Sequence, residues 1–117
     1  MTITIYGIPN CDTMKKARAW LDSHGVACDF HDYKKSGIER AKLEAWSKKV
    51  GWETLLNRAG TTFRKLADGD KQGLTESKAI KLMLEQPWLI KRPVLELPRG
   101  KVLVGFKPDV YESTFAS

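Results

Sequence analysis

The first 33 residues predict a strand, a helix and a second strand, and this order constrains the fold more than any other feature of the sequence. Residues 2–6 are β-branched or aromatic, and Gly7 and Pro9 end the run. In residues 26–33 apolar side chains alternate with polar ones, which predicts a second strand. Between the two runs, residues 12–24 carry apolar or small side chains at helical spacing, namely Met14, Ala17, Trp20 and Leu21. Such a segment forms a parallel strand pair joined by a right-handed crossover.

The middle of the chain predicts further helices. Leu43, Trp46 and Val50 are spaced for one face of a helix, and a shorter helix is expected around residues 52–56. Thr75 is a candidate N-cap for a third helix before Pro87 closes it. The expected buried face of that helix comprises Ala79, Ile80, Met83 and Leu84.

The last part of the chain returns to strands. Residues 94–97 and 102–104 predict a hairpin, and Pro108 suits the first turn of a final helix. We therefore expect an α/β, thioredoxin-like fold, βαβ followed by ββα. A helical insertion over about residues 38–86 is expected inside one domain spanning residues 1–117.

Composition excludes several classes of protein. The net charge of +6 comes from basic and acidic residues that are mixed along the chain, so nucleic-acid binding is not expected. The N-terminal residues do not resemble a signal peptide and no apolar run is long enough to cross a membrane, so we expect a cytoplasmic protein without membrane association. The two cysteines match neither a disulfide framework nor a metal site.

Cys11 is the candidate nucleophile. It stands between the first strand and the first helix, where backbone N–H groups and the helix dipole stabilise a thiolate. Lys15 would lower its pKa further and Asp12 would raise it, and we expect a net decrease. The alternative is that Cys11 is a small buried residue without chemistry.

The second cysteine is not expected to pair with the first. Cys28 lies at the opposite end of the predicted crossover and is expected in the core, so a disulfide with Cys11 would need rearrangement. Met14 stands where a Cys-x-x-Cys motif places its second sulfur. A reactive Cys11 would then depend on an external thiol, and in a cytosol that thiol is first of all glutathione.

Several segments in order resemble the arsenate reductase ArsC/Spx family, and within it most closely the YffB branch. They are residues 3–6 with Pro9 and Cys11, residues 55–57, 61–66, 80–83 and 89–90, Arg92-Pro93, and residues 104–106. The resemblance implies a thioredoxin-like fold with a helical insertion and a nucleophilic Cys11. It also implies an arginine, Arg92, before a cis-proline, Pro93, that faces the cysteine; the alternative is an ordinary surface arginine entering a strand.

The chain departs from the arsenate reductase pattern at three positions. Gly7 stands where that pattern has a histidine, while Asn57 and Lys107 stand where it has two oxyanion-binding arginines. Arg58 lies beside Asn57. Arginine and lysine bind oxyanions differently, so these exchanges argue against arsenate as the substrate.

The expected function is therefore a glutathione-dependent thiol reductase with Cys11 as catalytic residue. Arg92, Pro93, Arg58, Lys107 and Asn57 are the candidates for binding glutathione or substrate, and for Arg58 and Lys107 a solvated surface position is an equal alternative. We expect no tightly bound cofactor and no metal. The partners would be glutathione, a small-molecule or protein disulfide, and as a further candidate glutaredoxin. The alternatives are an arsenate reductase coupled to glutathione and glutaredoxin, and an Spx-like regulator that binds RNA polymerase, although Met14 removes the Cys-x-x-Cys switch usual in that branch.

Overall fold

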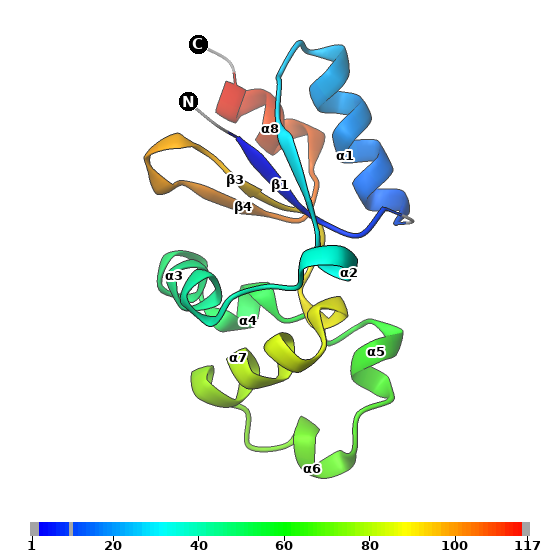
Figure 1. Cartoon of the computed structure of the whole chain (residues 1–117), viewed down its shortest axis with the longest axis vertical. Helices are drawn as coiled ribbons and strands as arrows, with labels where there is room; N and C mark the ends of the chain where they lie inside the picture. The colour runs from blue at the N-terminus through cyan, green and yellow to red at the C-terminus, as the bar shows by residue number, and fades with distance from the viewer. Residues whose placement is uncertain (1–2, 10, 116–117) are drawn as a thin grey trace. The chain divides into compact units, whose positions relative to one another are not determined.

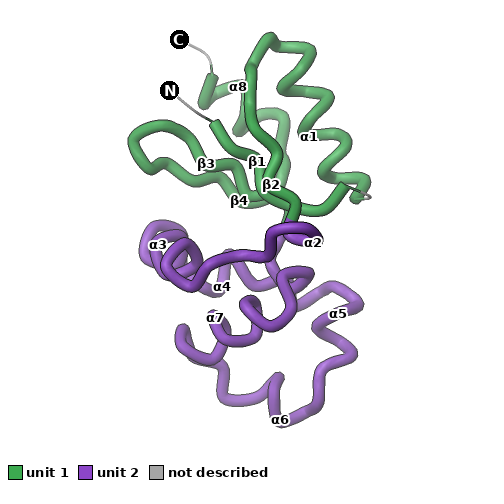
Figure 2. Tube along the Cα trace, in the orientation of Figure 1, with its two compact units in different colours: residues 1–32, 92–117 green, residues 33–91 purple. Residues whose placement is uncertain are grey.

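The computed structural model describes residues 3–9 and 11–115 and divides the chain into two compact units. Unit 1 comprises residues 1–32 and 92–117, and unit 2 comprises residues 33–91 (Figure 2). Unit 1 contains a single sheet, and unit 2 is helical (Figure 1). Within the described residues, none of the helices has the length and hydrophobicity that crossing a bilayer requires.

The sheet of unit 1 has the strand order β2-β1-β3-β4. Strand β1 (Thr4–Gly7) pairs in parallel with β2 (Asp29–Asp32), and helix α1 (Asp12–Ser23) makes the crossover between them. On its other side β1 pairs antiparallel with β3 (Val94–Glu96), which forms a hairpin with β4 (Val102–Val104). The 3₁₀ turn η2 (Pro98–Gly100) connects β3 to β4, and α8 (Pro108–Phe115) follows. This is the predicted thioredoxin-like arrangement.

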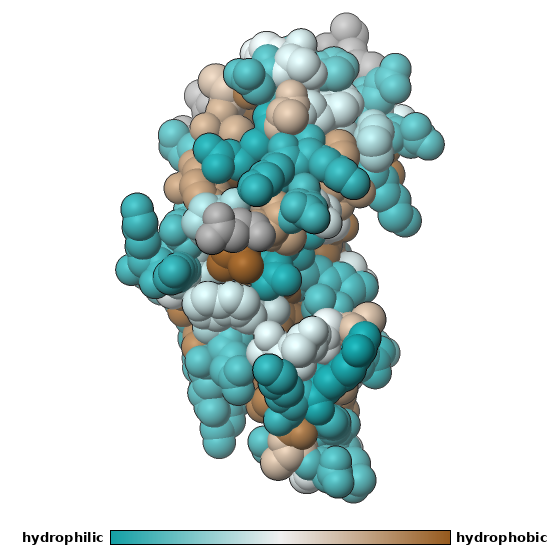
Figure 3. All heavy atoms as spheres, turned by 90° about the vertical axis from the view of Figure 1, so that its right-hand side faces the viewer, coloured by the Kyte–Doolittle hydropathy of each residue, from teal (hydrophilic) through white to brown (hydrophobic). Residues whose placement is uncertain are grey.

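One face of the sheet carries the core of unit 1. The fully buried residues there come from both central strands and from α1 and α8, and they are Ile5, Met14, Ala17, Leu21, Leu95 and Tyr111. The predicted helical stripe of α1 is confirmed except at Trp20, which is only half-buried. The opposite side of α1 is solvated, and the surface over it is mostly hydrophilic (Figure 3).

Strand β2 is shorter than the sequence suggests. Residues 26–28 precede the strand, so only residues 29–32 of the strand expected over residues 26–33 are paired with β1. The chain turns into helix α2 (Tyr33–Ser36) directly after Asp32. Of the expected first strand, residue 2 lies outside the described residues.

Unit 2 contains the three predicted helices and, among the described residues, three further short ones. Helices α3 (Arg40–Val50), α4 (Trp52–Leu55) and α7 (Glu76–Glu85) correspond to the three expected from the sequence. Helices α2, α5 (Thr61–Arg64) and α6 (Asp68–Lys71) have four residues each, too few to produce a periodic signal. Thr75 caps α7 by accepting a hydrogen bond from the backbone N–H of Lys78. The buried face of α7 includes Leu82, whereas Leu84 is only half-buried.

Unit 2 is longer than the helical segment of residues 38–86 expected from the sequence. At its start it includes α2, and at its end the 3₁₀ turn η1 (Pro87–Leu89) and Ile90. Ile90 forms a β-bridge with Leu56, and the N–H of Asn57 donates to the carbonyl of Leu89 at 2.8 Å. Between the helices, the hydroxyl of Ser47 donates to Glu76 Oε2 at 3.0 Å and joins α3 to α7.

Gly7 and Met14 fit together where β1 meets α1. A Cβ atom at Gly7 would lie 2.3 Å from Sδ and 2.8 Å from Cε of Met14. Met14 is 1% exposed, so its side chain has little room to withdraw. With Met14 in this conformation, a residue larger than glycine fits at position 7 only if the Met14 side chain shifts.

We predict that Gly7→Ala lowers the free energy of unfolding by about 1–3 kcal/mol, the usual cost of forcing extra volume into a packed core. Urea denaturation measures the change. Gly69→Ala is the matched control, because no described atom lies within 4 Å of a Cβ built there. In a Met14→Ala background the cost of Gly7→Ala should largely disappear. Equal effects of Gly7→Ala and Gly69→Ala would show that the contact with Met14 does not restrict position 7.

Candidate functional site

Cys11 occupies the N-cap position of α1, as the sequence predicts. Its backbone is extended, with φ −105° and ψ 127°, and its carbonyl accepts the first helical hydrogen bond from the N–H of Lys15 at 3.0 Å. Its sulfur lies at the N–H groups of Thr13 and Met14 in the first turn of α1, and a thiolate accepts hydrogen bonds from such groups much better than a neutral thiol does.

The surroundings of Cys11 favour the thiolate. Partial burial raises the pKa of Cys11, but hydrogen bonds from the backbone N–H groups of Met14 and Thr13 lower it. The positive charge of Arg92 and a hydrogen bond from its side chain lower it further, and the net pKa is below the usual value for cysteine. The expected decrease is thus confirmed in direction, but the cation responsible is Arg92 rather than Lys15.

Arg92 reaches Cys11 because of the register between β1 and β3. Tyr6 pairs with Val94, so one step further along both strands Pro93 comes opposite Gly7, close to the loop that leads to Cys11. The peptide bond between Arg92 and Pro93 is cis, as the resemblance implies. Pro93 is buried, and its carbonyl accepts a hydrogen bond from the N–H of Gly105 at 2.8 Å.

Lys107 belongs to the same unit as Cys11 and Arg92. Its side chain is exposed, and its carbonyl accepts hydrogen bonds from the N–H groups of Val110 and Tyr111 in the first turn of α8. The backbone of Lys107 therefore stabilises the start of α8. Any contact of its ammonium group with a ligand remains a prediction.

Asn57 and Arg58 belong to unit 2 and have local partners there. The side-chain oxygen of Asn57 accepts a hydrogen bond from the N–H of Ala59 at 3.3 Å, and its amide nitrogen closely approaches Gly60. The Arg58 guanidinium lies 6.0 Å from the centre of the Trp52 ring and the side chain is exposed. Their proposed roles in ligand binding therefore stay predictions.

Cys28 differs from Cys11 in position and chemistry. It precedes Asp29, which pairs with Thr4 at the amino end of β1, whereas Cys11 follows the carboxyl end, and both described cysteines are free. Burial raises the pKa of Cys28, and the nearby charge of Arg18 only partly opposes this. The side chain packs against the core but is half-buried, because it also borders a cavity.

Within residues 3–9 and 11–115, no group of three or more His, Cys, Asp or Glu side chains is placed to hold a metal ion. The groups that the structure brings together at the site are the Cys11 thiol, two backbone N–H groups and the Arg92 guanidinium. This arrangement can form a thiolate nucleophile and hold an anionic group beside it.

Comparison with solved structures and curated proteins places this site in a known family. A structure named YFFB protein is 63% identical, with a TM-score of 0.95, and the match covers 98% of this chain and 100% of that one. An uncharacterized protein from Haemophilus influenzae is 41% identical over 97% of this chain and 99% of its own length.

More distant relatives carry two different functional names. The global transcriptional regulator Spx of Streptococcus agalactiae is 32% identical over 92% of this chain and 78% of its own length. An arsenate reductase of Rhizobium meliloti is 30% identical over 99% of this chain and 89% of its own length. The sequence model of the ArsC family matches residues 6–114, a range that contains Cys11 and Arg92. This chain therefore belongs to the ArsC family.

Proposed function

We propose that this protein is a thiol–disulfide reductase that uses Cys11 as its nucleophile and glutathione as its reducing co-substrate. The observation that carries the proposal is the stabilisation of the Cys11 thiolate by the N–H groups of Thr13 and Met14 and by Arg92. The thiolate is the form of cysteine that attacks a disulfide.

The proposed reaction has two exchange steps. In the first, the Cys11 thiolate attacks a disulfide substrate, a bond forms between the two sulfurs, and one half of the substrate leaves as a thiolate. When the substrate is a mixed disulfide of glutathione, Cys11 retains the glutathione half. In the second step a free glutathione thiolate attacks the sulfur of that retained half, so that oxidised glutathione forms and the Cys11 thiolate leaves. The substrate gains two electrons and two glutathione sulfurs end as one disulfide.

An external thiol is needed because the chain offers no suitable second sulfur near Cys11. Met14 fills the position of a resolving cysteine and is buried, and Cys28 lies at the other end of β1 and β2. Glutathione is the abundant small thiol of a reducing cytosol, where we expect this protein to act. Its two carboxylates match cationic groups, for which Arg92, Lys107 and Arg58 are the candidates, with Asn57 and Pro93 as further contacts.

Arsenate reduction is the second candidate, favoured by the name of the Rhizobium meliloti relative and by the arginine beside Cys11. An oxyanion would be held at Cys11 by Arg92 in the same way as a carboxylate. Against it, Lys107 and Asn57 replace the other two arginines of the arsenate reductase pattern. Arsenate-dependent oxidation of glutathione, with glutaredoxin present, would establish this reaction.

A transcriptional regulator is the third candidate, from the name of the Spx relative, and the family resemblance implies that such a regulator would act by binding RNA polymerase. Because Met14 replaces the second cysteine of the switch, its binding would not respond to oxidation. Capture of RNA polymerase by both wild type and Cys11→Ser would favour this function over catalysis.

We predict that wild-type protein reduces bis(2-hydroxyethyl) disulfide with glutathione as donor and that Cys11→Ser falls to the uncatalysed background. Oxidation of glutathione is followed through NADPH and glutathione reductase. Mass spectrometry after incubation with oxidised glutathione should find the adduct on Cys11 and not on Cys28. Cys28→Ser is the control and should keep the activity. Full activity of Cys11→Ser would rule out this mechanism.

We also predict that Cys11 reacts with iodoacetamide at lower pH than an unfolded cysteine does. Its pKa is lowered, so the thiolate is already populated below the usual range. Arg92→Gln removes one cause of the decrease and should move the midpoint of the rate profile to higher pH, and Arg92→Lys should move it less. In the same samples Cys28 should titrate above the unfolded reference, because burial raises its pKa. An unchanged midpoint in Arg92→Gln would contradict the assigned role of the guanidinium.

A further inference from the structure

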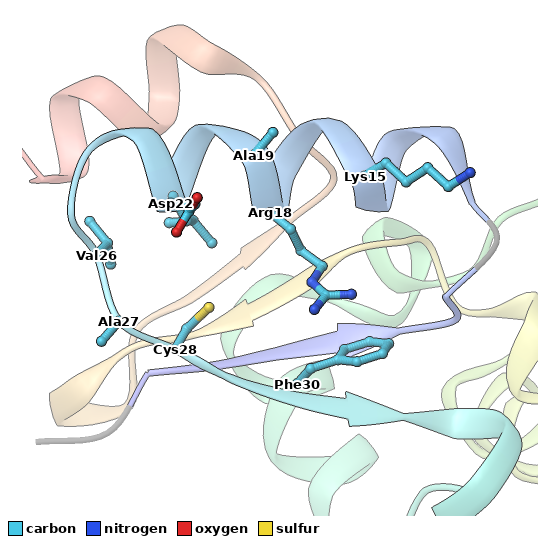
Figure 4. Close-up of a pocket in the computed structure, with 9 residues that line it drawn as sticks. Lys15, Arg18, Ala19, Asp22, Val26, Ala27, Cys28 and Phe30 are labelled. Carbon is cyan, nitrogen blue, oxygen red and sulfur yellow. The ribbon is translucent and has the colours of Figure 1, made fainter.

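A cavity of about 580 Å³ lies in unit 1 between α1 and the segment that leads into β2. Its volume falls within the usual range for small-molecule sites, about 300–1,000 Å³. Helix α1 supplies one wall and residues 26–30 the other (Figure 4). The lining residues are Lys15, Arg18, Ala19, Leu21, Asp22, Val26, Ala27, Cys28 and Phe30. Neither Cys11 nor Arg92 is among them, so this cavity is distinct from the candidate active site.

Arg18 is the main polar group of the cavity. Its side chain reaches from α1 toward β2 (Figure 4), where the centre of the guanidinium lies 4.6 Å from the centre of the Phe30 ring. This stacking holds the planar guanidinium in one orientation while its N–H groups stay available. Among the described residues, no carboxylate forms an ion pair with Arg18 or with Lys15. Two cations thus border the cavity, and neither of them forms an ion pair within the described residues.

The other lining residues define what kind of anion would fit. Asp22 offsets one of the two cations, which leaves a single net positive charge. Cys28 adds no negative charge near neutral pH, because burial raises its pKa. The sulfur of Cys28 points toward α1 and, with Leu21, Val26 and Phe30, gives the cavity an apolar part (Figure 4). A dianion without hydrocarbon, such as phosphate, matches neither the charge nor this surface.

We propose that the cavity binds a small organic monocarboxylate. Its carboxylate pairs with the Arg18 guanidinium, and its hydrocarbon part packs on Leu21, Val26 and Phe30. A guanidinium binds a carboxylate through two parallel hydrogen bonds, which an ammonium group cannot do. Lys15, one turn nearer the start of α1, adds attraction without fixing orientation.

Cys28 provides a direct measure of occupancy, because a bound ligand would cover its sulfur. The experiment follows alkylation of Cys28 by N-ethylmaleimide in wild-type protein, with peptide mass spectrometry, in the presence of 4-phenylbutyrate. At about ten times its Kd the ligand should slow Cys28 alkylation about tenfold, since the rate falls with the free fraction. The neutral analogue 4-phenylbutyramide and inorganic phosphate should give little protection. Absence of protection by the carboxylate, or equal protection by the amide, would overturn the proposal.

Two variants and an internal reference locate the binding. Arg18→Gln should abolish protection, judged as the ratio of rates with and without ligand because Arg18 also affects Cys28 itself. Lys16→Gln, an exposed position on α1 outside the cavity, should keep it. Alkylation of Cys11 in the same samples should be unaffected by the ligand. Protection retained in Arg18→Gln, or protection of Cys11 equal to that of Cys28, would contradict the proposed site.

Discussion

Strand β1 pairs on both sides, and this double pairing determines where the groups of the candidate site lie. Parallel pairing with β2 requires a crossover helix, so α1 begins just beyond the carboxyl end of β1 and Cys11 stands at its first cap. Antiparallel pairing with β3 brings Pro93 level with Gly7. Arg92 is therefore held beside Cys11 although the two are far apart in the sequence. A slip of one residue in the register between β1 and β3 would separate them.

The pKa of Cys11 reflects opposing effects of its position at the start of α1. Burial of Cys11 disfavours the charged form, yet burial also strengthens the hydrogen bonds and the charge interaction that favour it. The N–H groups of Thr13 and Met14 belong to the first turn of α1, where no helical partner exists for them. The positive charge beside the sulfur does not come from the helix but from Arg92. At Cys28 burial is the largest influence and the charge of Arg18 offsets it only in part, so its pKa moves the other way.

The sequence predicted the elements whose signal is local and missed those that depend on neighbours distant in the sequence. Hydrophobic spacing identified α1, α3 and α7, and turn residues identified the hairpin, because each signal extends over many residues. Helices α2, α5 and α6, with four residues each, were missed. The order of the predicted elements was enough to place Cys11 at the start of a helix. The charged groups expected to shift its pKa were its neighbours in the chain, Lys15 and Asp12. The resemblance to a family had implied that Arg92 lies at the site, because it precedes a cis-proline that faces the cysteine, and the pairing register explains how it comes close to Cys11.

The close fit of Gly7 and Met14 links two departures from the patterns of the family. A residue with a Cβ at position 7 conflicts with Met14 as it is packed, and Met14 occupies the place of a second cysteine. Methionine at position 14 and glycine at position 7 are therefore matched, because the Met14 side chain fills the space that a Cβ atom at position 7 would need. The consequence for chemistry is that this chain has neither that histidine nor an adjacent second thiol. Its cysteine must then be ionised beforehand by N–H groups and by Arg92, and a thiol from outside must complete the exchange under the proposed function.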